Sequence, residues 1–161
     1  MRTIRAVISG CLFGGFMGGF FALQYGLASG AINGLVTGLL FGTGIYFFIT
    51  SKMIDKQTQI VVNADESIVL SDGANHFLNG EGVGGKLYLL NDRVQFKSHR
   101  FNIQNHEFEI GIADVEEVRF YNIYGIIPAG LEIRTTAGGK EKFVIHDRDK
   151  WKTAIVRIKG A

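Results

Sequence analysis

Three side chains that can carry positive charge lie close together in the sequence, at Lys97, His99 and Arg100, and Lys86 precedes them. Cationic groups gathered on a short segment can contact the phosphates of anionic lipid headgroups or the acidic groups of a protein partner. The same pattern is also typical of a solvated loop that has no ligand. We take these four residues as the candidate lipid- or partner-binding site.

The histidines and the cysteine do not form a metal-binding pattern. His76, His99, His106 and His146 lack the i,i+4 spacing of a helical metal site, and no cysteine pair accompanies them. Cys11 is the only cysteine, so no intramolecular disulfide can form. We therefore expect neither a metal ion nor a cofactor.

None of the other polar patterns predicts catalysis. Glu107 and Glu109 alternate along one predicted strand face, which is typical of a solvated surface. The glycine-rich residues 80–85 are followed by a predicted strand, whereas a nucleotide-binding loop is followed by a helix. The sequence also lacks a nucleophile elbow. We therefore expect a protein that is not an enzyme.

A long uncharged segment precedes all of the candidate residues. From Ala6 to Thr50 the chain has no Asp, Glu, Lys, Arg or His, and a helix of that length would measure roughly 68 Å. The hydrocarbon core of a bilayer needs only about 20 residues per span. Residues 1–51 are therefore predicted to contain two membrane-spanning helices, near Ile4–Leu27 and Ala31–Ser51, with a reversal at residues 28–30.

The charges beside the predicted spans indicate their orientation. Arg2 and Arg5 lie at the start of the first span, Lys52 and Lys56 follow the second, and the connection between the spans has neither Lys nor Arg. By the positive-inside rule, both termini and the C-terminal domain of this multi-pass membrane protein are cytoplasmic. A cleaved signal peptide is the alternative, but the second apolar stretch favours two spans.

Glycine recurs every four positions through most of both predicted spans. Repeated GxxxG spacing makes a flat helix face that another helix backbone can approach closely. The spans can pack on each other through it, or a second face at Gly15 and Gly19 can build a homo-oligomer, even a pore. The predicted helix-packing residues are Gly10, Gly14, Gly18, Gly26, Gly30, Gly34, Gly38 and Gly42.

The rest of the chain predicts a linker, residues 52–66, and one soluble domain, residues 67–161. Acidic and basic residues are equal in number beyond residue 50. A nucleic-acid-binding domain would be strongly basic, so we do not expect nucleic acid as a partner.

Alternating apolar residues in the soluble half predict an antiparallel meander followed by one helix. Residues 86–90 and 93–97 form a predicted hairpin, and further strands are predicted at residues 107–110, 115–120, 131–134 and 142–145. The inner face of the hairpin carries Leu87, Leu89, Val94 and Phe96. Asp147 is the predicted N-cap of the helix, whose buried face carries Trp151, Ala154, Ile155 and Ile158.

The connection between the strands at residues 115–120 and 131–134 is rich in apolar residues. It contains Tyr121, Tyr124, Ile126, Ile127 and Pro128. This stretch can cap the core, or, if it is exposed, it can contact a partner or dip into the membrane.

Several motifs of the soluble half, in their order, resemble those of the GRAM domain, a member of the pleckstrin-homology-like (PH-like) superfold. The resemblance covers about residues 67–158, and its motifs are Ala74-Asn75-His76-Phe77, residues 80–89, residues 91–99, residues 101–106, residues 125–131 and Arg148-Asp149-Lys150-Trp151. It implies an α+β fold: a seven-stranded antiparallel β-barrel or sandwich capped by one C-terminal α-helix, following the N-terminal transmembrane hairpin.

The GRAM resemblance also implies a non-catalytic module that binds phosphoinositides or proteins near membranes. Lipid-binding members of the superfold place basic residues around the loop between their first two strands. Here that loop is Asn79-Gly80-Glu81-Gly82, and Lys86 is the nearest cation. We therefore expect a membrane-anchored module that binds lipid headgroups or an unidentified protein at the inner leaflet, with a structural, oligomerising membrane protein as the alternative.

Overall fold

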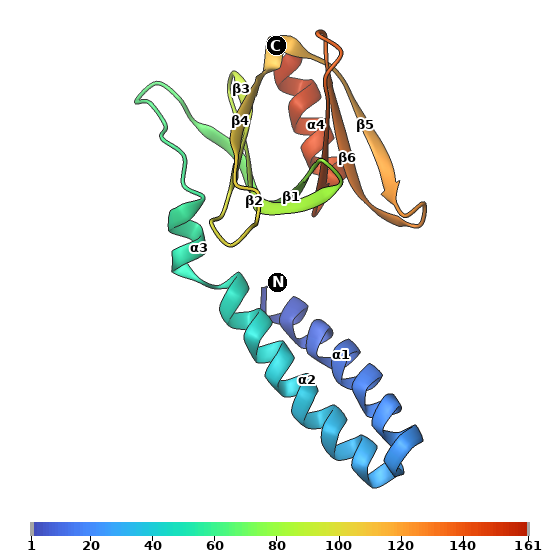
Figure 1. Ribbon diagram of the computed structural model, residues 1–161. Helices are drawn as coiled ribbons and strands as arrows, with labels where there is room; N and C mark the ends of the chain where they lie inside the picture. The colour runs from blue at the N-terminus through green and yellow to red at the C-terminus, as the bar shows by residue number, and fades with distance from the viewer. Residues whose placement is uncertain (1, 161) are drawn as a thin grey trace. The chain divides into compact units, whose positions relative to one another are not determined.

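The computed structural model describes residues 2–160, and these form two compact units, one ending at Asp55 and the other beginning at Lys56 (Figure 1). The first unit contains α1 (Arg2–Tyr25) and α2 (Leu27–Ile49). Both helices are long and apolar enough to cross a membrane, judged by length and composition.

The two helices are separated by a single residue, Gly26, rather than by the predicted reversal at residues 28–30, which is helical. Gly26 has φ = 87°, a left-handed conformation that a residue without Cβ adopts at little cost. The prediction was wrong because Gly30 packs against Gly18 and Ala22 of α1, which places residues 28–30 in the first turn of α2 despite their modest helix propensity.

Glycines of α1 and α2 face each other along an antiparallel seam. A Cβ added at Gly14 would lie 2.6 Å from the carbonyl oxygen of Gly34, and one added at Gly10 would lie 2.7 Å from that of Gly38. Of the eight predicted packing glycines, seven lie in this seam. Gly26 does not, because it occupies the turn and has open space around it.

The second unit begins within a short helix, α3 (Lys52–Gln57), in the region predicted as a linker. A seven-stranded antiparallel sheet follows, in the spatial order β4-β3-β2-β1-β7-β6-β5. The strands are β1 (Ile68–Leu78), β2 (Glu81–Leu90), β3 (Arg93–Ser98), β4 (Glu107–Gly111), β5 (Val115–Ile123), β6 (Ile127–Thr135) and β7 (Lys140–Ile145). A 3₁₀ turn, η1 (Ile112–Asp114), joins β4 to β5.

The sheet curls around the C-terminal helix α4 (Arg148–Lys159), as a half-barrel (Figure 1). The inward positions predicted for the β2–β3 hairpin and most of the apolar face predicted for α4 are confirmed, since these side chains are buried in one core and Ile158 packs against it. The Asp147 carboxylate accepts a hydrogen bond from the Lys150 backbone N–H, which confirms the predicted N-cap. The buried Trp151 indole donates to Asp72 of β1 (3.3 Å).

A polar cluster lies where the two halves of the sheet meet. His76 of β1 is 2 % exposed; its Nε2 lies 2.8 Å from Glu141 Oε2, and its Nδ1 lies 2.8 Å from His106 Nε2. The rings of Phe96, Phe108 and Phe143 pack against His76. The pattern fits a neutral His76 that donates to the Glu141 carboxylate and accepts from His106.

Burial lowers the pKa of His76, although the neighbouring Glu141 carboxylate raises it in part. Burial also lowers the pKa of His106, and the nearby His76 lowers it further. Both histidines therefore favour the neutral form more strongly in the folded domain than in the unfolded chain, where the ordinary pKa of histidine is 6.5.

We expect the tight glycine seam to be sensitive to a larger residue at position 14 but not at the neighbouring position 15. Gly14→Leu should destabilise the α1–α2 pair by about 1–3 kcal/mol, because its side chain would meet the backbone of α2. Gly15→Leu is the matched control, because no atom lies within 4 Å of a Cβ at Gly15. Energy transfer between fluorophores on cysteines at positions 3 and 47, in a Cys11→Ser background, would report helix separation during SDS titration. Equal midpoints for the two variants would contradict the seam.

We expect the soluble domain to lose stability as the pH falls below about 6.5. Folding lowers the pKa values of His76 and His106, so below pH 6.5 the unfolded chain binds more protons than the folded domain. The contribution of these two histidines to stability is therefore fully present above the unfolded pKa and is lost as the pH falls. Urea unfolding followed by Trp151 fluorescence should show a lower midpoint at pH 5.5 than at pH 7.5, with a smaller difference in His76→Gln or, if that variant does not fold, His106→Gln. The control is His146→Gln, since His146 is exposed; an equal pH effect in all variants would disprove the assignment.

Candidate lipid- or partner-binding site

The candidate cations lie on the outer face of the β2–β3 hairpin. Lys86 and Lys97 are directly opposite each other in the register of β2 and β3. Lys86 Nζ lies 5.4 Å from the centre of the Tyr88 ring, and Lys97 Nζ lies 3.1 Å from Glu107 Oε2 of β4. Lys97 is therefore partly neutralised, whereas Lys86 packs against an aromatic ring.

His99 and Arg100 continue this surface beyond the end of β3. The His99 backbone N–H donates to the Gly84 carbonyl (3.2 Å), which keeps the chain beside β2. Burial lowers the pKa of His99, so its ring contributes little positive charge at neutral pH. Arg100 is exposed, and its backbone N–H donates to Gln57 Oε1 (2.9 Å). The structure thus brings the four predicted residues together, with Lys86, Lys97 and Arg100 as the cations.

Residues 57–67, which we name the strap, contact the β2–β3 hairpin at both of their ends, beginning beside these cations. The Tyr88 hydroxyl donates to the Thr58 carbonyl (2.8 Å), and Thr58 is only 1 % exposed. At the other end, Arg93 pairs with both carboxylate oxygens of Glu66 (2.5 and 3.1 Å). This hydrogen bonding by Arg93 is the main reason that the pKa of Glu66 falls to about 2.

The strap was not foreseen from the sequence, which indicated only a linker there. Its residues have no apolar periodicity, and their partners Tyr88, Arg93 and Arg100 lie far away along the chain. The cluster of His76, His106 and Glu141 was missed for the same reason. No group of three His, Cys, Asp or Glu residues in the described part of the chain is arranged to hold a metal ion.

The apolar connection between β5 and β6 is exposed. Tyr124 is 90 % exposed and Ile126 is 79 % exposed, so the core-capping alternative is wrong for the end of this hairpin. The turn is tight: Tyr124 and Gly125 have φ values of 51° and 76°, and the Ile126 N–H donates to the Ile123 carbonyl (3.1 Å). This geometry holds the Tyr124 side chain away from the sheet.

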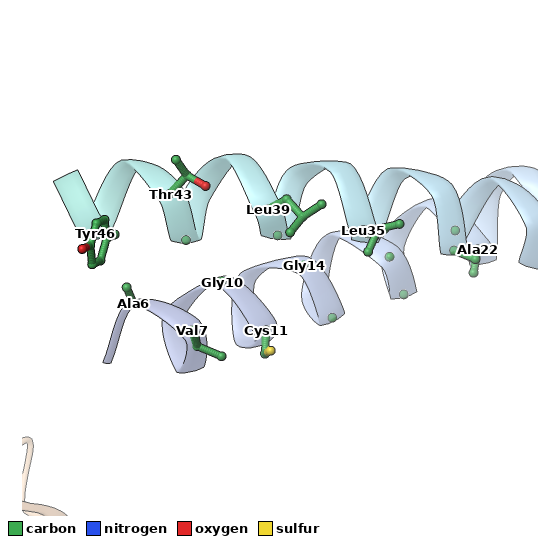
Figure 2. Close-up of a pocket in the computed structure, with 18 of the residues that line it drawn as sticks. Ala6, Val7, Gly10, Cys11, Gly14, Ala22, Leu35, Leu39, Thr43 and Tyr46 are labelled. Carbon is green, nitrogen blue, oxygen red and sulfur yellow. The ribbon is translucent and has the colours of Figure 1, made fainter. Parts of the chain in front are cut away.

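One side of the α1–α2 pair contains an open apolar groove of about 890 Å³ (Figure 2). The seam glycines line its floor, and Cys11, Gly15, Gly19 and Leu39 are among its other lining residues. A Cβ at Gly15 or Gly19 would have no neighbour within 4 Å, so the second glycine face of α1 is uncovered within the chain.

No protein-family model matches the sequence, and no curated protein matches it either. Solved structures do match. The C-terminal domain of an unknown protein from Leishmania infantum is 13 % identical, with a TM-score of 0.53, over 71 % of this chain and 97 % of that one. The N-terminal PH domain of Vps36 is 12 % identical, with a TM-score of 0.51, over 65 % of this chain and 86 % of that one.

A structure containing the DH and PH domains of p115-RhoGEF is 9 % identical, with a TM-score of 0.50, over 83 % of this chain but only 46 % of that one. At such identities the likeness concerns the fold alone. Two long apolar helices are thus followed by a curled seven-stranded antiparallel sheet and a C-terminal helix, and the second unit has a PH-like fold.

Proposed function

We propose that this protein is a membrane-anchored, non-catalytic binding module of the GRAM type. In this proposal α1 and α2 span the bilayer with both ends in the cytoplasm. The PH-like domain then uses Lys86, Lys97 and Arg100 to bind anionic lipid headgroups of the inner leaflet. PH-like domains typically bind lipids or proteins, which is consistent with this role.

The hydrogen bond between the Arg100 backbone and Gln57 carries the proposal. Only seven residues lead from Thr50, just after α2, to Gln57, so this connection can extend by at most about 25 Å. A cation surface attached to Gln57 therefore stays within reach of headgroups if α2 spans the bilayer. The anchor also raises the effective concentration of lipid around the domain, so a weak site is sufficient.

Local charge, and not the charge of the whole domain, supports headgroup binding. The soluble half is neutral overall, so it has no long-range attraction to an anionic membrane. Lys86 and Lys97 are directly opposite each other in the register of β2 and β3; among the described residues, Lys97 pairs with Glu107, whereas Lys86 lies over the Tyr88 ring. Like charges at opposite positions of a hairpin disfavour each other, and a bound anionic phosphate would offset this.

We expect Lys86→Ala/Lys97→Ala/Arg100→Ala to weaken binding of the soluble unit, residues 56–161, to vesicles containing phosphatidylserine. Each cation near an anionic surface contributes about 1 kcal/mol, so the three together should change the affinity by about a hundredfold. Vesicle sedimentation at low and high salt would measure this. The control is Lys140→Ala/Lys150→Ala/Arg157→Ala, which removes the same charge elsewhere. An equal loss in both variants, or no binding by the parent, would refute the proposal.

The open groove of the α1–α2 pair favours a second candidate function, self-association in the membrane. Lipid tails offer helices no hydrophobic driving force, so a flat glycine face is favourable mainly where another helix packs closely on it. The second glycine face, Gly15 and Gly19, is available for a second copy of this chain.

If two copies pack groove to groove, oxidation of native membranes should join them through Cys11. This residue is exposed, lines the groove and is the only cysteine. Non-reducing gels should show one discrete dimer band, which Cys11→Ser removes. Gly19→Leu should reduce the band several-fold by filling the groove while leaving the α1–α2 seam intact. Disulfide products with other cysteine-containing proteins, or a dimer band insensitive to Gly19→Leu, would point to random collision.

A further inference from the structure

We propose that the PH-like domain inserts two apolar loops into the lipid interface of the membrane. One is the tip of the β5–β6 hairpin, with Tyr124, Ile126 and Ile127. The other is the β3–β4 loop, with Phe101 and Ile103. This inference rests on the proposed membrane anchor, and it adds an apolar contact that headgroup binding by the cations does not require.

The side chains of both loops are exposed where a soluble domain would normally carry polar residues. Ile103 is 91 % exposed, and Phe101 and Ile127 are each about half exposed. Further from the loops, β5 and β6 bury Val118, Leu131 and Ile133 in the core, so the most exposed apolar side chains of this hairpin lie at its tip. Large apolar side chains gathered on a protruding end indicate a contact with another apolar phase.

The β5–β6 turn holds its aromatic residue outward at an energetic cost. Tyr124 has φ = 51°, a left-handed conformation that asparagine or glycine adopts more easily than tyrosine. A tyrosine that is strained and almost fully exposed gains nothing from the core of this domain. At a membrane interface, however, its ring can lie among the acyl chains while its hydroxyl remains hydrated.

Both loops lie at the same end of the half-barrel, opposite the end where α4 finishes (Figure 1). The β3–β4 loop includes Arg100, and its Asn102 side chain hydrogen bonds to the Gly84 backbone (2.7 and 2.9 Å), close in sequence to Lys86. Cations and exposed apolar side chains are thus adjacent on this loop. A membrane interface matches that combination, because headgroups and acyl chains lie a few ångströms apart.

The charges around the β5–β6 tip are mixed, so apolar insertion explains the tip better than anion binding does. Arg148 donates to the Tyr121 carbonyl (2.9 Å), and Lys142 Nζ lies 5.6 Å from the centre of the Tyr121 ring. The carboxylates of Asp147 and Asp149 flank Arg148 in the sequence. A protruding tip also needs no preformed pocket in a fluid bilayer, whereas a protein partner would need one.

The full chain, with Cys11→Ser, can carry one environment-sensitive fluorophore at Tyr124→Cys, Ile103→Cys or Ala137→Cys. Ala137 lies in the exposed β6–β7 turn, which has no large apolar side chain, and is the control. In vesicles of phosphatidylcholine and phosphatidylserine, quenchers on the acyl chains should reduce emission several-fold at positions 103 and 124 but not at 137. The chain labelled at position 103 retains Tyr124, so it tests insertion without altering the β5–β6 tip. Quenching at both sites no stronger than at 137 would overturn the inference.

The same labelled chains separate this inference from the headgroup proposal. Quenching at position 124 that persists in high salt and in the Lys86→Ala/Lys97→Ala/Arg100→Ala variant supports insertion even if the cations bind no lipid. Salt-sensitive vesicle binding of the soluble unit without quenching at positions 103 and 124 would support headgroup binding and refute insertion. Crosslinks from position 124 to another protein in native membranes, without quenching, would assign the tip to a protein partner and also refute insertion.

Discussion

The pairing of β1 with β7 joins the two halves of the soluble domain, and the arrangement of its loops depends on it. The paired register is only three residues long, from Ala74 opposite Ile145 to His76 opposite Phe143. Because the connection is so short, side chains must reinforce it. Aromatic rings and the hydrogen-bonded chain of Glu141, His76 and His106 surround this joint. A buried polar network of this kind is favourable only while its members remain correctly protonated.

The strap has a comparable role on the outer face of the domain. It ties the residues that follow the apolar helices to the sheet at two places, through Thr58 and through the pair of Glu66 and Arg93. Residues 57–67 cannot extend while these contacts hold, so Gln57 and Thr58 stay beside the cations of the β2–β3 hairpin.

The glycine seam of the first unit brings the backbones of two helices into close contact, and the stacked rings of Phe13 and Phe41 add a side-chain contact between them. Seven of the eight predicted packing glycines meet the opposite helix, and no larger residue could occupy Gly14 or Gly34 without displacing the partner backbone. The same spacing leaves Gly15 and Gly19 on an open side. One repeated pattern therefore specifies a packed face within the chain and a free face beside it.

The sequence by itself determined the features that depend on local periodicity: two long apolar helices, the inward faces of the β2–β3 hairpin, and the capped amphipathic helix α4. Strand β1 was reached only through the resemblance, because Ser71, Asp72 and Gly73 interrupt its alternation. Only the tertiary structure decided the turn at Gly26, the docked strap, the histidine cluster and the exposure of the β5–β6 tip. Each of these depends on contacts between residues distant in the chain, or on which of several nearby small residues takes a left-handed conformation. Periodicity along a sequence contains neither kind of information.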